Sequence, residues 1–453
     1  MSIGMFESFM TAHWFSAGAK EVWTDETTLQ TWLDVEAALA ESQAELGVIP
    51  ASAAAMIRTK ADARLFDRAQ LARDIAFMQH PLVPVLRQFE MLCGDSAAGY
   101  LHWGATTQNI LDTACSMQMA RTHGLMLNEL DVALNALTTL AMRNKDVAMA
   151  GRTHGQHALP MTFGFKVAGW LDELDRDRAR LRERFSSSFT VSMSGAIGTF
   201  GATGKIGREV EVLVAKKLGL QPSIVQLRAS FDRVADYCVA LGLLAGTTQR
   251  IGQDIAFMQR TEVGEVAEAF HLGKVGSSTM AQKRNPTVAL LLVSLSRLLR
   301  GRVPLVLESM VRMDEGDSSA TNVSDVLLPE ISIIAASIGE TLSHLANGLS
   351  VDADAMRRNL ELTHGLVASE TAMMGLAHVM GRHEAHHLLY EAAQRAQSEH
   401  IPLLTALREH PVFQSQPLPS ELDHWLDPAA NVGESSSIVE DVVNRLSRNR
   451  PIN

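Results

Sequence analysis

The chain has 453 residues, with 40 Lys and Arg against 51 Asp and Glu, and its formal net charge of −11 disfavours nucleic-acid binding through bulk electrostatics. Three widely spaced cysteines, Cys93, Cys115 and Cys238, predict neither a disulfide framework nor a metal cluster. No charged-then-apolar leader precedes Lys20, the first basic residue, so we expect no export signal. Serines and arginines interrupt the most apolar stretch, residues 287–310, so we expect no membrane span. Together these features predict a cytoplasmic protein.

Apolar residues at alternating spacings of three and four predict long helices. Leu127, Leu130, Leu134 and Leu137 follow this rhythm, as helices that pack at shallow angles do. An N-terminal helix is expected after the acidic first turn at residues 25–26. Further helices are predicted at residues 165–186, 231–260, 287–312, 331–349 and 365–397.

Strand-like alternation is nearly absent, and residues 192–204, rich in Gly, Ser and Thr, form the clearest internal loop. We therefore predict an all-α protein with three helical domains. They are an N-terminal helical domain at residues 1–100, a central bundle of long helices at 101–350 and a C-terminal helical domain at 351–453.

The first polar constellation precedes the central helix. Residues 102–113 read His-Trp-Gly-Ala-Thr-Thr-Gln-Asn-Ile-Leu-Asp-Thr. The hydroxyls of Thr106 and Thr107, with the N–H groups of a helix start, form an anion site. Capping of the helix by either threonine is an equally open alternative at this point.

The second constellation is dense in polar groups. Residues 151–160 read Gly-Arg-Thr-His-Gly-Gln-His-Ala-Leu-Pro. His154 lies between Thr153 and a glycine, so a substrate can approach it closely, and imidazole titrates near neutral pH as a proton donor requires. A lone histidine is more often structural, but the neighbouring Arg152, Gln156 and His157 do not suit a core.

The third constellation is the most specific. Residues 276–286 read Gly-Ser-Ser-Thr-Met-Ala-Gln-Lys-Arg-Asn-Pro. Gly-Ser-Ser alone would be an ordinary polar turn. Lys283 and Asn285 add a cation and an amide suited to a carboxylate, and Pro286 stops the segment from continuing an earlier helix.

The three segments together resemble the fumarase/aspartase superfamily, in its adenylosuccinate lyase and 3-carboxy-cis,cis-muconate cycloisomerase branch. Residues 259–266, Asp232-Arg233 and the tail around residues 426–429 fit the same branch, so the resemblance covers nearly the whole chain. It implies an enzyme without a cofactor, acting on a small dicarboxylate-type substrate. It also implies a homotetramer whose active sites combine segments from three chains.

The resemblance assigns a role to each matching residue. Ser277 is the base, as an alkoxide formed in a closed site, and His154 is the acid that protonates the leaving group. Gln253, upstream of the loop, is expected to face the same cleft. The implied substrate-binding residues are Thr106, Thr107, Gln108, Thr153, Gln253, Ser278, Met280, Lys283 and Asn285.

The implied activity is release of fumarate from an N-substituted aspartate. Bacterial cycloisomerases often lack the histidine at position 154, so its presence favours elimination, although the cycloisomerase stays an alternative. Adenylosuccinate is disfavoured, because residues 1–20 lack an Arg-Tyr pair and because Asp314, Glu315 and Asp317 would repel a phosphate. A catalytically silent homologue is disfavoured by the intact motifs, and the leaving group is left open.

Two positions depart from the family pattern, because Ala281 replaces a proline and Asn109 an aspartate. One competing motif is His-Glu-x-x-His at residues 383–387, which is typical of zinc proteases. It has no recognisable third ligand downstream, so we expect an exposed helix face and no metal.

Overall fold

The computed structural model describes residues 4–226, 228–270, 279–280 and 282–448. The helices before the central bundle are α1 (Ala17–Val22), α2 (Asp25–Glu45), α3 (Ala51–Lys60), α4 (Arg68–Met78), α5 (Leu82–Cys93) and α6 (Asp95–Ala98). The next helices are α7 (Thr107–Arg143), α8 (Phe163–Ser188), α9 (Gly204–Leu218), α10 (Asp232–Met258), α11 (Thr287–Arg300), α12 (Val303–Glu308) and α13 (Ser318–Gly348). The last helices are α14 (Ala353–Glu361), α15 (Ser369–Met380), α16 (Arg382–Glu399), α17 (Leu403–Arg408), α18 (Pro411–Ser415), α19 (Leu422–Trp425) and α20 (Ser435–Arg448).

Short 3-10 turns and four short strands complete the described elements. The turns are Ala12–Trp14, Ala63–Leu65 and Leu366–Ala368, and the strands are β1 (Ala148–Thr153), β2 (Gln156–Thr162), β3 (Val266–Ala267) and β4 (Ser350–Val351). β1 pairs with β2 and β3 with β4, both antiparallel. The prediction of an essentially all-α fold with long helices is confirmed, but the hairpin β1–β2 was not predicted.

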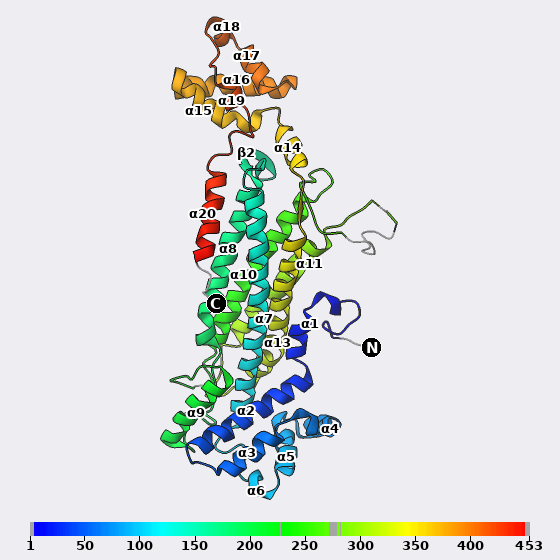
Figure 1. Ribbon diagram of the computed structural model, residues 1–453, viewed down its shortest axis with the longest axis vertical. Helices are drawn as coiled ribbons and strands as arrows, with labels where there is room; N and C mark the ends of the chain where they lie inside the picture. The colour runs from blue at the N-terminus through cyan, green and yellow to red at the C-terminus, as the bar shows by residue number, and fades with distance from the viewer. Residues whose placement is uncertain (1–3, 227, 271–278, 281, 449–453) are drawn as a thin grey trace. The chain divides into compact units, whose positions relative to one another are not determined.

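The chain divides into two compact units, each assembled from separate stretches of sequence. Unit 1 contains Met1–Leu130, Asp177–Gln249 and Ser294–Thr341, and unit 2 contains Asp131–Arg176, Arg250–Val293 and Leu342–Asn453. Figure 1 labels the long helices α7, α8, α10, α11 and α13. Each of these helices contributes residues to both units. The division into three domains near residues 100 and 350 stays a prediction.

The predicted apolar seam packs the long helices. Leu130, Leu134 and Leu137 of α7 are at most 3% exposed. In unit 1, a Cβ added at Gly339 of α13 would lie 3.1 Å from the carbonyl oxygen of Met126 on α7. Backbones that approach this closely require small residues at the crossing, so the seam specifies both burial and helix spacing.

Three predicted helices differ from the observed ones. Residues 365–397 break at Gly381, which has φ +85° between α15 and α16. The segment 287–312 divides into α11 and α12 around residues 301–302. The helix expected at 331–349 begins earlier, at Ser318, because Asp317 accepts the backbone N–H of Ser319 at 2.9 Å and caps the helix there. The helix then continues through Pro329.

Among the described helices, α13 is long and apolar enough to cross a membrane by length and composition alone. Of its apolar window, 72% is buried inside the structure. A core helix passes the same test, and burial of this extent is what a core helix shows.

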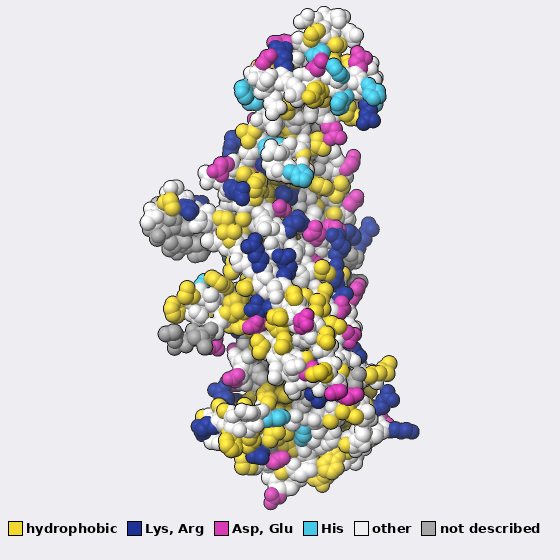
Figure 2. Space-filling view, turned by 180° about the vertical axis from the view of Figure 1, so that it is seen from behind, with side chains coloured by type: hydrophobic (Ala, Val, Ile, Leu, Met, Phe, Trp, Pro, Cys, Tyr) yellow, Lys and Arg dark blue, Asp and Glu magenta, His cyan; other side chains and the backbone are white. Residues whose placement is uncertain are grey.

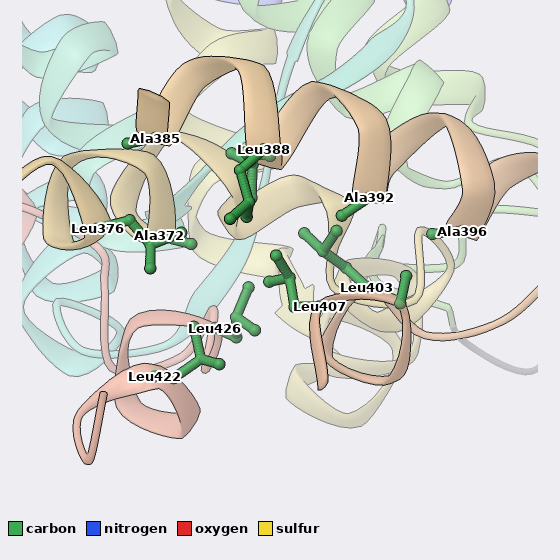
Figure 3. Packing of buried hydrophobic residues seen from close by; sticks show 12 residues of the cluster. Ala372, Leu376, Ala385, Leu388, Ala392, Ala396, Leu403, Leu407, Leu422 and Leu426 are labelled. Carbon is green, nitrogen blue, oxygen red and sulfur yellow. The ribbon is translucent and has the colours of Figure 1, made fainter. Parts of the chain in front are cut away.

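A separate apolar cluster in unit 2 holds α15, α16, α17 and α19 together. Figure 3 shows Leu376, Leu388, Leu407 and Leu422 directed into the space between these helices, and all four are at most 2% exposed. Gly375 lies at the same contact, where an added Cβ would be 2.3 Å from Cδ2 of Trp425. The indole therefore packs directly on the backbone of α15.

We predict that Gly375→Ala destabilises the protein by about 1–3 kcal/mol, the usual cost of overpacking a filled core. Urea unfolding followed by circular dichroism measures the change. Val379→Ala on the same helix is the control, because Val379 is 64% exposed and its truncation should change stability by less than about 0.5 kcal/mol. Equal stability of the Gly375 variant and wild type would contradict this packing.

Candidate active site

The start of α7 is held by Asn109, one of the two positions that depart from the family pattern. Its Oδ1 accepts the backbone N–H groups of Thr106 at 3.0 Å and Gly195 at 3.1 Å. Its amide donates to Ser192 Oγ at 3.0 Å, and the side chain is fully buried. An aspartate could not make that donation. Asn109 therefore joins the helix start to the loop around residues 192–195.

The hydroxyl of Thr107 has a partner that the sequence did not suggest. Nδ1 of His80 accepts the backbone N–H groups of Leu82 and Val83 at 3.2 and 3.3 Å, at the start of α5. The ring proton must then sit on Nε2, which lies 3.3 Å from Thr107 Oγ1 and donates to it. The hydroxyl proton of Thr107 remains available to a bound anion.

This arrangement fits a carboxylate site without a formal positive charge. The first N–H groups of a helix have no intrahelical acceptor, and the described contacts supply none for those of Thr107 and Gln108. The Gln108 side chain donates from Nε2 to Asp112 Oδ1 at 2.7 Å and is thereby held along the helix. Helix capping by Thr106 or Thr107 gains no support from the described contacts.

His154 occupies the tip of the hairpin β1–β2 in unit 2. Thr153 pairs with Gln156, so His154 and Gly155 form a two-residue turn with φ +54° and +77°. Both angles are positive, as in the type I′ turns that join antiparallel strands. A histidine in this region is strained. The turn exposes both Thr153 and His154 to solvent.

His157, one residue into β2, differs from His154 in its surroundings. It pairs with Arg152 across the hairpin. Burial and, secondarily, the charge of Arg152 lower the pKa of His157. His157 is half-buried, whereas His154 is exposed to solvent and accessible to a substrate.

A buried ion pair fixes the base of this hairpin. Arg152 donates Nη1 to Oε2 of Glu265 at 2.9 Å and Nη2 to Oε1 at 2.5 Å, and the Glu265 side chain is fully buried. Asn359 of α14 adds donations to Glu265 Oε1 at 2.9 Å and to the Val263 carbonyl at 2.7 Å. A bidentate pair with a further hydrogen bond can compensate the cost of burying charge.

The predicted loop lies only partly within the described residues. Ser277, Ser278 and Ala281 are outside them, whereas Met280 and Lys283 are exposed and Asn285 is half-buried. The backbone N–H of Lys283 donates to the Met280 carbonyl at 3.1 Å. Gln253 is exposed on α10, and its expected position in the same cleft stays a prediction.

The flanks of that loop are anchored by two side chains. The Glu268 carboxylate accepts the backbone N–H groups of Val288 at 3.1 Å and Ala289 at 2.6 Å, at the start of α11. Gln259 accepts the Glu268 N–H at 2.9 Å and donates to the Arg284 carbonyl at 3.2 Å. The segment 259–268 therefore contacts both the hairpin, through Glu265, and the residues that follow the loop.

Two protein-family models match this chain. The family described as Lyase matches residues 18–301, and the family described as Adenylosuccinate lyase C-terminus matches residues 365–442. The chain belongs to the fumarase/aspartase superfamily. The predicted family is thus confirmed, as is the prediction of an enzyme of the adenylosuccinate lyase and carboxymuconate cycloisomerase type.

Several superfamily members are similar along nearly their full length. N-acetyl-S-(2-succino)cysteine lyase of Dickeya dadantii is 36% identical over 424 residues, which cover 94% of this chain and 93% of the relative. The 3-carboxy-cis,cis-muconate cycloisomerase of Pseudomonas aeruginosa is 35% identical over 432 residues, 95% of this chain and 94% of the relative. The crystal structure of 3-carboxy-cis,cis-muconate lactonizing enzyme from Pseudomonas putida matches with a TM-score of 0.90 and 33% identity, over 96% of this chain and 98% of the other.

Membership of the superfamily does not by itself test the individual residues, whose assigned roles stay predictions. The structure distributes them between the units: Thr106, Thr107 and Gln108 belong to unit 1, and the hairpin and the loop belong to unit 2. His80, Glu265 and Glu268 were missed as functional neighbours. Residues 259–266 had been recognised as typical of the branch, which was the available signal for Glu265.

The zinc-protease alternative gains no support. His383 and His387 are exposed on α16, and His387 Nδ1 lies 3.6 Å from Glu391 Oε1. Figure 2 shows several histidines spread over the surface of the part that contains α15–α19. No group of three or more potential ligands that could hold a metal ion occurs among the described residues.

We predict that Glu265→Gln lowers the free energy of unfolding by about 3–5 kcal/mol, because it leaves the Arg152 charge without its buried partner. Chemical denaturation provides the measurement. Glu262→Gln is the matched control, because Glu262 is exposed three residues earlier and its neutralisation should change stability by less than about 0.5 kcal/mol. If the two variants unfold alike, the ion pair does not hold the hairpin.

Proposed function

We propose that the protein releases fumarate from a small compound that carries a succinyl group, by general acid–base elimination. The proposal rests on the anion-binding groups at the start of α7, in a chain that belongs to this superfamily. There His80 orients the Thr107 hydroxyl, and helix N–H groups remain available for a carboxylate. The exposed His154 on a strained turn supplies a candidate acid in the same chain.

In the proposed mechanism, Ser277 removes a proton from the Cβ carbon of the succinyl group. The electron pair first moves into the adjacent carboxylate, which Lys283, Asn285 and the threonine hydroxyls stabilise as it gains charge. Collapse of this intermediate forms the Cα–Cβ double bond and breaks the bond from Cα to the leaving atom. His154 gives its proton to that atom, and proton return from the serine through solvent restores both groups.

For the leaving atom we favour sulfur. The similarity to the Dickeya dadantii enzyme, whose name specifies an S-succino thioether, supports this choice. The N-substituted aspartate suggested by the sequence is the second candidate, supported by the match to the adenylosuccinate lyase C-terminal family. The lactone-forming cycloisomerase reaction is a third, supported by the Pseudomonas aeruginosa relative.

A substrate panel tests the proposal. Purified enzyme is incubated with N-acetyl-S-(2-succino)cysteine, an N-substituted aspartate and 3-carboxymuconate, and fumarate is followed by absorbance. We expect fumarate from the thioether at the highest kcat/KM. Conversion of 3-carboxymuconate without fumarate release from any succinyl compound would contradict the elimination.

The acid is tested by leaving-group dependence. We predict that His154→Gln lowers kcat/KM on an N-substituted aspartate by about 100-fold or more, because an amine must be protonated as it leaves. The loss on the thioether should be clearly smaller, since a thiol has a pKa of about 8.5 and its thiolate leaves more readily. His386→Gln, exposed on α16, is the control. Equal losses on both substrates would remove His154 from this role.

We further propose a homotetramer in which each site combines segments of different chains. Apolar side chains on helices of the bundle support this, because Leu243 and Leu290 are 50% and 49% exposed in the single chain. Light scattering gives the assembly state.

Complementation tests the shared site. We predict that Ser277→Ala loses at least ~100-fold in turnover, the low end for a general base, and that His154→Ala is also impaired. Dissociating and reassembling the two variants together should recover part of the activity. The Ser277 variant reassembled alone is the control. No recovery, or full activity of a monomer, would contradict shared sites.

A further inference from the structure

A cavity of about 140 Å³, lined by both polar and apolar side chains, lies within unit 1, beside the start of α7. Gln108, Asp112 and Cys115 line it from one face of that helix, at positions four and three residues apart. Side chains from residues 223–226 and 228–234, Arg312 and the start of α13 line the other sides. The cavity therefore begins next to Thr107 and extends along α7 by about 10 Å, at 1.5 Å per residue.

Two arginines, Arg228 and Arg312, line this cavity and bring positive charge to it. Arg228 Nη1 donates to the Ala196 carbonyl at 3.5 Å, and Arg312 donates Nη1 to the Arg228 carbonyl at 3.1 Å. The Arg312 guanidinium also lies over the Phe231 ring, 4.1 Å from its centroid. Neither arginine forms an ion pair with a carboxylate of the described residues. Both are thus held by carbonyl oxygens and an aromatic face, with N–H donors to spare.

Arg312 is half-buried where it lines the cavity together with Arg228. Burial lowers the pKa of Arg312; the charge of Asp112 opposes this shift, and the charge of Arg228 adds to it. An anion between the two guanidinium groups would relieve their repulsion. A carboxylate matches the planar donor arrangement of a guanidinium better than a simple ion does.

Two carboxyl groups line the same cavity. Burial raises the pKa of Asp112, and burial together with the charge of Asp112 raises the pKa of Asp325 to about 6. Their oxygens are acceptors for an N–H group of a ligand. The cavity therefore presents donors for a carboxylate and acceptors for an amide or ammonium N–H, the combination that an amino acid carries.

The volume limits the size of the occupant. An engineered cavity of about 150 Å³ holds one benzene molecule, and sites for drug-sized ligands begin at about 300 Å³. A nucleotide exceeds this enclosed space, whereas a small organic group is of the right order.

We propose that this cavity binds the leaving group of the substrate, and that this group is amino-acid-derived, with its carboxylate held by Arg228 and Arg312. The inference rests on the proposed function, in which the succinyl carboxylate occupies the start of α7. The leaving group then extends past Gln108 into the cavity. Arg228 and Arg312 would be the residues that determine specificity for it.

The test compares two substrates that differ only in the recognised group. They are N-acetyl-S-(2-succino)cysteine and N-acetyl-S-(2-succino)cysteamine, which lacks the cysteine carboxylate. We expect wild-type kcat/KM to be about 10- to 100-fold higher for the first, the usual effect of a charged hydrogen bond. Arg228→Gln and Arg312→Gln should abolish this preference by slowing the first substrate alone, and Arg312→Lys should restore part of it.

Arg208→Gln is the matched control, because Arg208 is exposed on α9 outside the cavity; it should change either rate by less than about twofold. Equal use of both substrates by the wild type would overturn the proposal, even if the arginine variants fail to fold. An equal loss on both substrates in folded arginine variants would also overturn it.

Calorimetry separates this proposal from the proposed function. If the wild type releases fumarate from neither thioether, the proposed function is wrong for thioethers, and binding of N-acetylcysteine decides the cavity. Binding that is stronger than that of N-acetylcysteamine, and that is lost in Arg228→Gln, supports the site. Absence of binding, or binding unchanged in that variant, overturns it.

Discussion

The buried pair of Arg152 and Glu265 is the constraint on which the candidate catalytic segments of unit 2 depend. A carboxylate without solvent needs its hydrogen-bond partners, and here the charged partner, Arg152, comes from the hairpin and the neutral one, Asn359, from α14. Any displacement of the hairpin would leave Glu265 unpaired at a cost of several kcal/mol. That coupling can hold His154 in a turn with positive φ, which its own conformational preference opposes.

The same principle recurs at the other candidate segments. Glu268 and Gln259 bind backbone groups on either side of the predicted loop, and Asn109 binds those of the helix start and of the loop near Gly195. Apolar packing does not suit these places, because a site for a dicarboxylate has to keep polar groups accessible. Buried polar side chains that satisfy backbone donors fix such segments without covering them.

Much of the fold was predictable, because helix periodicity is local and repeated. The seam of α7 and the span of α10 follow from it. The hairpin was not predictable in the same way. β1 reads Ala-Met-Ala-Gly-Arg-Thr, which has little alternation and one β-branched residue, so its strand conformation depends on pairing and on the turn at His154-Gly155. Breaks at Gly381 and after α11 were missed because the apolar pattern continues across them.

The candidate site was predictable to the extent that its residues occur in recognisable runs. Thr106, Thr107, His154 and Lys283 belong to such runs. His80 does not, because it acts through a contact 27 positions along the chain that no local pattern encodes. Sequence motifs therefore identify the groups expected to touch a substrate, whereas the groups that orient them require the structure.

Asp317 differs from the other acidic residues near the start of α13 in how its charge is used. Asp317, expected to repel a phosphate, accepts hydrogen bonds from the Ser319 hydroxyl and from the N–H groups of Met313 and Ser319. These bonds lower the pKa of Asp317 to about 2 and direct its charge to the start of α13. Asp317 is thus a helix cap, and only Asp314 and Glu315 remain as exposed charges. Under the proposed placement of the leaving group, the enclosed volume of about 140 Å³ beside α7 also disfavours a nucleotide.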